Sequence, residues 1–244
     1  MARRAVVTGA ASGIGRGAAE RLLREGVDVL AVDRDAAGLE PLAAAGASVL
    51  VADLALESER ERVVEAGAGA DYLVNSAGII RIKPILEFTV DDWRAIFAVN
   101  AEAVFFLCQR LGARMPDGGA IVNLSSSSAK LASTHEVAIY AASKTTVTSI
   151  TRSFAYAFAE RRIRVNAICP GIVDTPMQAH VLAEVAPLRG LTAEQLSDAR
   201  TAVVPLRRGS TPDECAGLVW FLLSDEAAYM TGQSINFSGG LVTW

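Results

Sequence analysis

The chain alternates short apolar runs, rich in β-branched residues, with longer segments rich in Ala, Leu, Glu and Arg. The short runs are apolar throughout, which is typical of strands in a sheet that is covered on both faces. Strands that alternate with helices in this way predict an α/β fold, a doubly wound parallel sheet in a three-layer α/β/α sandwich. The expected strands are residues 4–8, 28–32, 48–52, 71–75, 120–125, 164–168 and 234–238.

The segments between the strands carry helix signals, and several of them end in glycine, a common helix stop. The expected helices are residues 15–26, 35–46, 56–67, 90–115, 140–160 and 212–224. Residues 170–212 are predicted to be mostly irregular. An irregular stretch of that length inside a compact domain usually has a function, and we expect a loop region at about 175–211 to cover a substrate.

Length and composition bound the class of protein. The chain has 244 residues, of which 51% are hydrophobic and 20% are charged. It shows no linker and no internal repeat, so we predict a single domain over residues 1–244. The formal net charge of -4 and the short basic runs argue against a nucleic-acid partner.

The cysteines and the N-terminus predict the compartment. Cys108, Cys169 and Cys215 are far apart and have no CxxC pair or histidine cluster beside them, which argues against disulfides and a metal site. The opening "MARRAVVTGA" is unlike a signal peptide. No apolar run approaches the roughly 20 residues needed to span a membrane. We therefore expect a cytoplasmic protein that has no membrane partner.

A glycine-rich stretch, "TGAASGIG" at residues 8–15, follows the first expected strand and opens the first helix. Gly9, Gly13 and Gly15 carry no side chain where a pyrophosphate would approach backbone N–H groups, and the helix N-terminus adds partial positive charge. The spacing differs from the general G-x-G-x-x-G fingerprint. A tight turn that merely needs glycine is therefore the alternative.

The second expected strand leads to Asp33, where an acidic residue accepts hydrogen bonds from the adenosine ribose. A carboxylate at this place also repels the 2′-phosphate of NADP, which favours NAD. Arg34 is the opposing signal, because its guanidinium would accommodate that phosphate. The structural alternative is a strand-end aspartate that caps the next turn.

Tyr140 and Lys144 are four residues apart in "YAASK", so a helix places them on one face. A free phenol has a pKa near ~10 and is a poor base at neutral pH. A neighbouring ammonium is expected to lower that pKa, so that the phenol exchanges protons with an alcohol or a ketone. Serines in "NLSSSS" (123–128), which ends the fifth strand, would face the same crevice. A surface helix pair and a serine-rich turn are the alternatives.

These motifs occur in one chain, in order. In them the chain resembles the short-chain dehydrogenase/reductase family, and the resemblance covers essentially the whole sequence. It implies a Rossmann-type fold and NAD(P)(H)-dependent interconversion of alcohols and carbonyls. The motifs are "TGAASGIG" (8–15), "NSAG" (75–78), "NLSS" (123–126), "YAASK" (140–144), "CPGIVDTPM" (169–177) and "TGQSINFSGG" (231–240).

The resemblance also implies roles for single residues. Tyr140 would be the acid/base, Lys144 would lower its pKa and bind the nicotinamide ribose, and Asn100 would hold a water in a proton relay. Asp53, with Leu54 beside it, would contact the adenine. The other residues implied in cofactor binding are Gly9, Ser12, Gly13, Ile14, Gly15, Asp33, Asn75, Ala77, Gly78, Pro170, Gly171, Val173 and Thr175.

The catalytic serine has two possible assignments. The strand motif "NLSS" points to Ser126, whereas the family's more common spacing before the tyrosine points to Ser127. We favour Ser126, because strand register fixes the direction of its side chain and the loop absorbs an extra residue. The chain departs from the family pattern at Ser76, where asparagine is usual, and at Ser238, where aspartate is common.

The substrate and the partners are the least readable part. Arg81, His135, Glu136, Met177 and His180 lie near motif ends, and their polarity favours a small polyol, sugar or hydroxy acid. The alternatives are a 3-oxoacyl thioester reductase and a dinucleotide-binding sensor or scaffold without catalysis. The resemblance implies a homotetramer, for which two apolar helices and the C-terminal segment offer surfaces.

Overall fold

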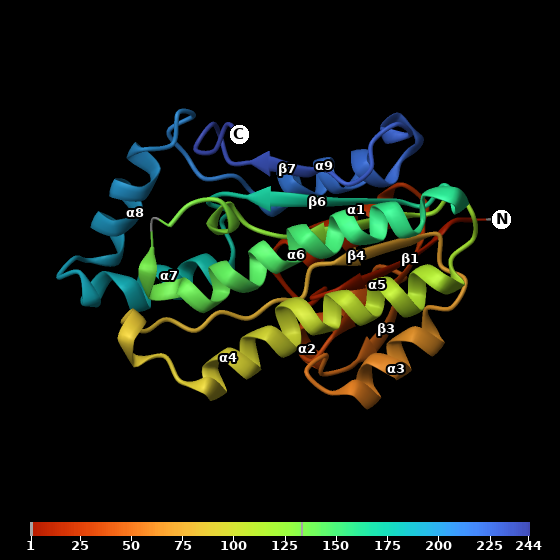
Figure 1. Cartoon of the computed structure of the whole chain (residues 1–244), viewed down its shortest axis with the longest axis horizontal. Coiled ribbons are helices and arrows are strands. Elements are labelled where there is room, and N and C mark those ends of the chain that lie inside the picture. The colour runs from red at the N-terminus through yellow and green to blue at the C-terminus, as the bar shows by residue number, and fades with distance from the viewer. Residues whose placement is uncertain (1, 133) are drawn as a thin grey trace.

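A seven-stranded parallel sheet in the order β3-β2-β1-β4-β5-β6-β7 forms the centre of the molecule (Figure 1). The order reverses between β1 and β4, and ligands of open α/β sheets bind beyond the carboxyl ends of the strands at such a point. The computed structural model describes residues 2–132 and 134–244. Its strands are β1 (Arg4–Thr8), β2 (Asp28–Asp33), β3 (Ser48–Val51), β4 (Tyr72–Asn75), β5 (Ala120–Leu124), β6 (Arg164–Pro170) and β7 (Ser234–Phe237).

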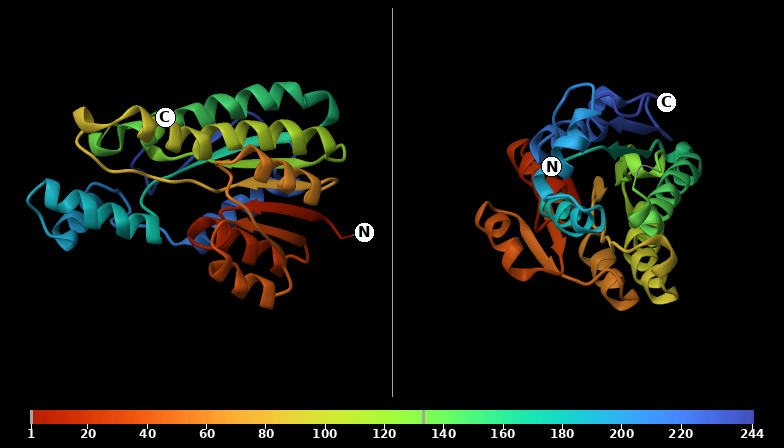
Figure 2. Two further views of the ribbon diagram at one scale, coloured as in Figure 1. Left: turned by 90° about the horizontal axis from the view of Figure 1, so that it is seen from below. Right: turned by 90° about the vertical axis from the view of Figure 1, so that its left-hand side faces the viewer.

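Helices cover both faces of this sheet, so the predicted fold class is confirmed (Figure 2). Helices α1, α2 and α9 pack on one face, and α3, α5 and α6 pack on the other. The bounds are α1 (Gly13–Arg24), α2 (Ala36–Ala44), α3 (Glu57–Ala66), α4 (Val90–Phe97), α5 (Ala103–Arg114), α6 (Ala138–Ala157), α7 (Pro176–Leu188), α8 (Ala193–Ala202) and α9 (Pro212–Leu223).

Successive residues of a central strand belong to opposite cores. Val7 of β1 packs in the core that contains α1 and α9, whereas Val6 packs in the core that contains α3, α5 and α6. This division follows from the two-residue period of a strand. Because both faces are buried, the strands read as continuous apolar runs in the sequence.

The single helix expected at residues 90–115 is interrupted. The segment begins at α4, which a capping box of Thr89 and Asp92 starts, and a π-helical turn at Ala98–Glu102 then separates α4 from α5. Such turns occur frequently at functional sites, because the extra residue re-aims the side chains around it. This one contains Asn100, one of the expected site residues.

Residues 170–212, expected to be mostly irregular, contain two helices. Thr175 caps α7, and a capping box of Thr192 and Gln195 starts α8. Pro187 and Gly190 are loop signals in the sequence, but they lie at the end of α7 and just beyond it, where a helix tolerates them. The region expected to be a substrate-covering loop is therefore a pair of helices, here called the helical cover.

The two helices have a small apolar core of their own beside the sheet. Partly buried Ile80, Ile82 and Leu182 pack against it. This cluster is separate from the two cores on the faces of the sheet. Its buried members are Val181, Val185, Ala186 and Leu196.

One described helical run, Val90–Arg114, is long and apolar enough to cross a membrane by length and composition, with a mean hydropathy of 1.3. This corrects the expectation that no apolar run approaches that length. Half of the apolar window is buried inside the protein, where Leu107 and Leu111 of α5 pack on the sheet. Its place in the core explains its hydropathy without a membrane.

Candidate active site

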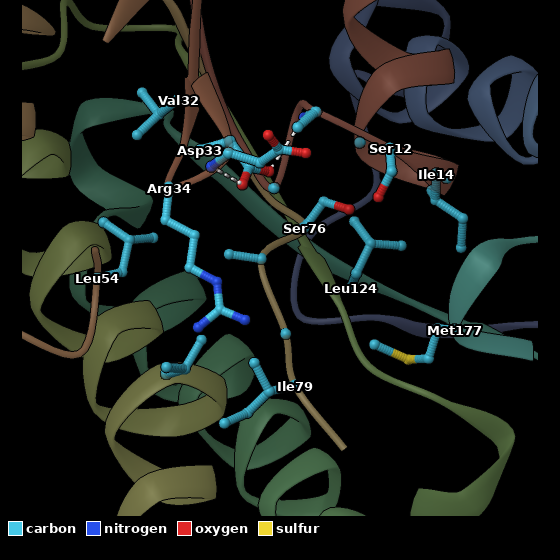
Figure 3. Close-up of a pocket in the computed structure, with 18 of the residues that line it drawn as sticks. Ser12, Ile14, Val32, Asp33, Arg34, Leu54, Ser76, Ile79, Leu124 and Met177 are labelled. Carbon is cyan, nitrogen blue, oxygen red and sulfur yellow. Dashed lines mark hydrogen bonds between the residues drawn. The ribbon is translucent and has the colours of Figure 1, made fainter. Parts of the chain in front are cut away.

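A cleft of about 350 Å³ opens at the carboxyl ends of the central strands (Figure 3). Its walls come from the turn after β1, the end of β2, the loop after β4 and the start of α6, so distant parts of the sequence meet here. The expected cofactor-binding residues that line it are Gly9, Ser12, Gly13, Ile14, Gly15, Asp33, Asp53, Leu54, Ala77, Gly78, Tyr140, Lys144 and Thr175.

The turn after β1 requires glycine. Gly9 and Gly13 have φ angles of 66° and 54°, in the left-handed region that favours glycine. A Cβ atom on Gly15 would lie 2.1 Å from the carbonyl oxygen of Gly9, and one on Gly9 would lie 2.7 Å from the Cα atom of Ala77. The turn is thus packed tightly against itself and against the loop after β4.

The N-terminus of α1 points its free backbone donors at this cleft. Ser12, its N-cap residue, makes no side-chain capping hydrogen bond, and the first turn holds no acidic residue. N–H groups at a helix N-terminus attract anions. Together with the missing side chains at Gly9 and Gly15, this end of the cleft fits the pyrophosphate of a dinucleotide.

Asp33 ends β2 with its carboxylate at the wall of the cleft. Its Oδ2 atom accepts a hydrogen bond from the backbone N–H of Ala11, and its Oδ1 atom accepts one from the N–H of Asp35, both at 3.0 Å. Asp33 therefore organises the two adjoining turns as well as facing the cleft. Arg34 beside it extends its side chain into the cleft, away from Asp33 (Figure 3).

Asn75, expected to line the cofactor site, is instead buried beneath it. Its Nδ2 atom donates a hydrogen bond to Oδ1 of Asn123 at 2.9 Å, which joins β4 to β5. Strand register turns this side chain into the core, and the next three residues, 76–78, form the cleft wall. Asn75 thus positions the wall and does not form part of it.

Tyr140 and Lys144 lie together on α6, as their spacing predicted. The Nζ atom of Lys144 is 5.7 Å from the centroid of the Tyr140 ring and donates a 2.7 Å hydrogen bond to the carbonyl of Leu124 at the end of β5. Ser126, two residues beyond Leu124, lies beside the Tyr140 side chain. The structure therefore brings three of the four expected catalytic side chains into one cluster.

Burial decides the protonation of this cluster. It raises the pKa of Tyr140, and the nearby hydroxyl of Ser126 only partly counteracts this rise. Burial also lowers the pKa of Lys144 to about 8. The expected lowering of the Tyr140 pKa by Lys144 is absent here, because the ammonium is itself desolvated and is held by the carbonyl of Leu124. The phenol is thus protonated at neutral pH, the form that donates a proton to a ketone.

Asn100, the fourth expected catalytic residue, is fully buried on the π-helical turn. Its Nδ2 atom donates to the carbonyl of Ile79 at 2.9 Å and to Oγ of Ser143 at 3.1 Å, and its Oδ1 atom accepts from the N–H of Ile79 at 2.8 Å. These bonds tie the loop after β4 to α6. Asn100 is therefore a positioning residue in this structure, and its place in a water relay stays a prediction.

A second pocket, also about 350 Å³, adjoins the cleft at Tyr140 and lies under α7 and α8. Ser126 and Ser127 both line it. Pro170, Gly171 and Val173, which the family resemblance assigns to the cofactor, line this pocket instead of the cleft, and Thr175 lines both. Tyr140 thus stands between two adjoining cavities.

The residues expected near the substrate divide clearly. Met177 lines the second pocket. Arg81 instead pairs with Asp92 at 2.6 Å, and Glu136 accepts hydrogen bonds from Arg189. The two histidines, His135 and His180, are exposed and lie outside the lining of the pocket. Among the described residues, no group of three or more His, Cys, Asp or Glu side chains is placed to hold a metal ion.

Fold and site have counterparts in known proteins. A family model described as "Enoyl-(Acyl carrier protein) reductase" matches residues 9–242. D-threitol dehydrogenase of Mycolicibacterium smegmatis is 38% identical, over 97% of this chain and 91% of that protein. The chain belongs to the short-chain dehydrogenase/reductase family.

Other relatives of this short-chain dehydrogenase/reductase are named for different substrates. Galactitol 2-dehydrogenase (L-tagatose-forming) of Cereibacter sphaeroides is 35% identical, over 98% of this chain and 95% of that protein. The 3-oxoacyl-[acyl-carrier-protein] reductase FabG of Thermotoga maritima is 36% identical, over 97% of this chain and 96% of that protein. Family membership makes this protein an NAD(P)-binding oxidoreductase.

A solved structure agrees with this placement. The structure of a putative NAD(P)-dependent gluconate 5-dehydrogenase from Beutenbergia cavernae, with bound NADP, superposes with a TM-score of 0.86. The two chains are 37% identical, and the match covers 98% of this chain and 96% of the other. Its bound NADP leaves the choice between NAD and NADP open for this family member.

Hydroxyl side chains that the sequence analysis did not single out also hold the short-chain dehydrogenase/reductase site together. Oγ1 of Thr8 accepts hydrogen bonds from the N–H groups of Ser76 and Ala77 at 3.1 and 3.2 Å. Oγ of Ser125 donates to the carbonyl of Lys144 at 2.8 Å. Their position at strand ends next to the motifs is the signal that would have found them.

We expect Ser126→Ala to lower kcat by roughly 10²-fold, the loss typical of a removed donor to a developing oxyanion. Ser126 lies beside the Tyr140 side chain in the second pocket, whereas Ser127 begins a short 3₁₀ turn. Ser127→Ala is therefore the matched control and should keep most of the activity. Steady-state kinetics of both variants decide the assignment, and a larger loss for Ser127→Ala would reverse it.

Proposed function

We propose that this protein is an NAD-dependent oxidoreductase that interconverts a secondary alcohol and a ketone by hydride transfer, with Tyr140 as the acid/base. The observation that carries the proposal is the position of Tyr140 between the two pockets, beside Ser126 and Lys144. A side chain at that boundary reaches a dinucleotide on one side and a substrate on the other.

Each residue of the cluster has its own proposed role in the reaction. The hydroxyls of Ser126 and Tyr140 hold the substrate oxygen, and Tyr140 gives a proton to the ketone or takes one from the alcohol. A charged Lys144 is proposed to stabilise the phenolate that forms during the reaction, an effect that the unliganded cluster does not show. The bound dinucleotide supplies the acceptor or donor of the hydride. Acid/base catalysis of this kind contributes about 10²–10⁴-fold, and the fixed orientation of the reactants adds to it.

The second pocket supports a small substrate. Its volume of about 350 Å³ suits a small molecule. Serine and threonine hydroxyls share its lining with aliphatic side chains. Relatives named as threitol and galactitol dehydrogenases support a polyol, a sugar or a hydroxy acid. The second candidate is a 3-oxoacyl thioester reductase, which the Thermotoga maritima relative of that name favours.

NADH absorbance with a panel of polyols, hydroxy acids, sugars and 3-oxoacyl thioesters tests the proposal. We expect NAD-dependent turnover of at least one small secondary alcohol and slower turnover of the thioesters. Preference for the thioesters would select the second candidate. Binding of NAD without turnover of any compound would favour a catalytically silent sensor or scaffold instead.

Asp33 is proposed to select NAD over NADP, because its carboxylate repels a 2′-phosphate. We expect Asp33→Asn to lower the ratio of kcat/KM with NAD to that with NADP at least about tenfold, since one charge repulsion of that size is about 1.4 kcal/mol. Asparagine keeps an oxygen that accepts a hydrogen bond from Ala11 or Asp35. Arg34→Ala is the companion variant and should weaken the binding of NADP, because it removes the guanidinium that would accommodate the 2′-phosphate. An unchanged ratio in Asp33→Asn would contradict this role.

We extend the proposal to a cytoplasmic homotetramer. Phe105 on α5 and Tyr156 on α6 are exposed large side chains, and Trp93 on α4 adds a third. Exposed aromatic side chains on neighbouring helices suit an interface between copies. Buried, free Cys108, Cys169 and Cys215 support a reducing compartment. Light scattering of the purified protein measures the assembly, and a monomer would contradict it.

A further inference from the structure

Arg200 is a cation of the second pocket that nothing in the described chain neutralises. It lies on α8, is partly buried, and lines the same pocket as Ser126 and Tyr140. Within residues 2–132 and 134–244, its guanidinium makes no hydrogen bond and no ion pair, and the charged group that acts on it is Arg189, which repels it.

The neighbouring Arg189 is already neutralised. Its guanidinium donates to both carboxylate oxygens of Glu136 at 2.8 Å. Glu136 is 4% exposed and lies two residues before α6, whereas Arg189 directly follows α7, so the ion pair holds α7 against the start of α6. No aspartate or glutamate is found among the described residues that line the pocket. Because Arg200 is not neutralised, the pocket carries a net positive charge.

A partly buried cation without a partner is unfavourable, because burial removes water and nothing replaces it. Both burial and the nearby Arg189 lower the pKa of Arg200. A guanidinium nevertheless keeps its charge at physiological pH. Such a group is suited to an anion that arrives with the substrate, since the anion replaces the missing partner.

We propose that Arg200 binds a carboxylate of the substrate, so that this enzyme acts on small hydroxy acids and oxo acids in preference to neutral polyols. The inference rests on the proposed function, because it selects one substrate class for that same site. Ser126 and Tyr140 hold the reacting oxygen, and Arg200 holds the acid group from a different wall of the pocket.

The chemistry of Arg200 favours a carboxylate over a phosphate ester. A planar guanidinium donates two parallel hydrogen bonds to one carboxylate. A phosphate ester carries about −1.5 to −2 charges at neutral pH, whereas the pocket offers one unneutralised cation. The volume of about 350 Å³ also suits a small acid.

Matched pairs of compounds test the inference. D-gluconate and D-glucitol differ by a carboxylate in place of a hydroxymethyl group, and 3-hydroxybutyrate and 3-hydroxybutanamide differ by a carboxylate in place of an amide. With NAD, we expect the wild type to favour the acid of at least one pair by about 10- to 100-fold in kcat/KM, as charge-assisted hydrogen bonds allow. Arg200→Met, an uncharged side chain of similar length, should remove that preference mainly through KM and leave the neutral partner nearly unchanged.

The control is Arg152→Met, which removes one exposed arginine of α6 outside the pocket. Arg152→Met should keep the preference for the acids. Because both variants remove one positive charge, this result would show that the effect of Arg200→Met does not come from the net charge of the protein. A wild type without preference for the acids, or an equal loss on acid and neutral partner in Arg200→Met, overturns the inference. Either result leaves the oxidoreductase itself standing.

A binding measurement separates the inference from the proposed function. If neither these pairs nor any compound of the wider panel turns over, the proposed function fails, and calorimetric titration of both acids into Tyr140→Phe with NAD decides about Arg200. Loss of binding in the double variant Tyr140→Phe, Arg200→Met supports the carboxylate site. Equal binding by both variants, no binding by either, or tighter binding of D-glucose 6-phosphate than of the acids overturns it.

Discussion

Tyr140→Phe is expected to bind NAD and to lose about 10²–10⁴-fold in turnover, because it removes the group that exchanges the proton. The substitution takes away one oxygen, which lies beside Ser126, and keeps the ring that lines both pockets. Quenching of protein fluorescence by NAD measures binding, and single-turnover formation of NADH measures the chemical step. A variant that binds NAD and turns over at a near-normal rate would rule out Tyr140 as the acid/base.

The pH dependence of the wild type provides a second readout of the same group. The raised pKa of Tyr140 keeps the phenol protonated at neutral pH. Alcohol oxidation needs the deprotonated form, so its kcat/KM should rise with pH above 7, whereas ketone reduction should fall once the phenol ionises. Lys144, with a pKa of about 8, loses its charge at a lower pH than the phenol ionises, so the limb of Tyr140 lies above that of Lys144. The limb should be absent from the residual activity of Tyr140→Phe.

Gly15→Ala is expected to raise the dissociation constant of NAD about 10- to 100-fold, because overpacking costs about 1–3 kcal/mol. The new Cβ atom would lie 2.1 Å from the carbonyl oxygen of Gly9, an atom of the backbone that cannot rotate away. The turn that faces the pyrophosphate must therefore move. Calorimetric titration with NAD measures the loss.

Gly217→Ala is the matched control for this substitution. Gly217 lies inside α9, and a Cβ atom there would meet nothing within 4 Å. Alanine should raise the free energy of unfolding by up to about 1 kcal/mol, the difference in helix propensity, and leave the affinity for NAD unchanged. If Gly15→Ala kept normal affinity for NAD while folding normally, the turn would not be the phosphate site.

The sheet could be predicted from the sequence because its strands are buried on both faces. Val6 and Val7 face opposite cores, so both positions must be apolar and the run is easily recognised. The helical cover could not be predicted in the same way. Helices α7 and α8 enclose only a small separate cluster, so their apolar periodicity in the sequence is weak. Proline and glycine near their ends also suggested a loop.

The candidate site shows the same division between local and distant causes. The relation of Tyr140 to Lys144 follows from the helix period, and the sequence predicted it. The direction of the Tyr140 pKa depends on burial among residues from distant segments of the chain, which no local pattern contains. Arg200 was not anticipated for a similar reason, since its place in the pocket depends on a helix that the sequence did not reveal.

The separate apolar cluster under α7 and α8 bears on how such enzymes diverge. Because Val181, Val185 and Leu196 pack with one another and not in the cores of the sheet, substitutions in the cover leave the nucleotide half of the molecule intact. Selection can therefore exchange one alcohol for another by altering this small module. Relatives named for threitol, galactitol and acyl-carrier-protein substrates, each about one third identical to this chain, are what such exchange would produce.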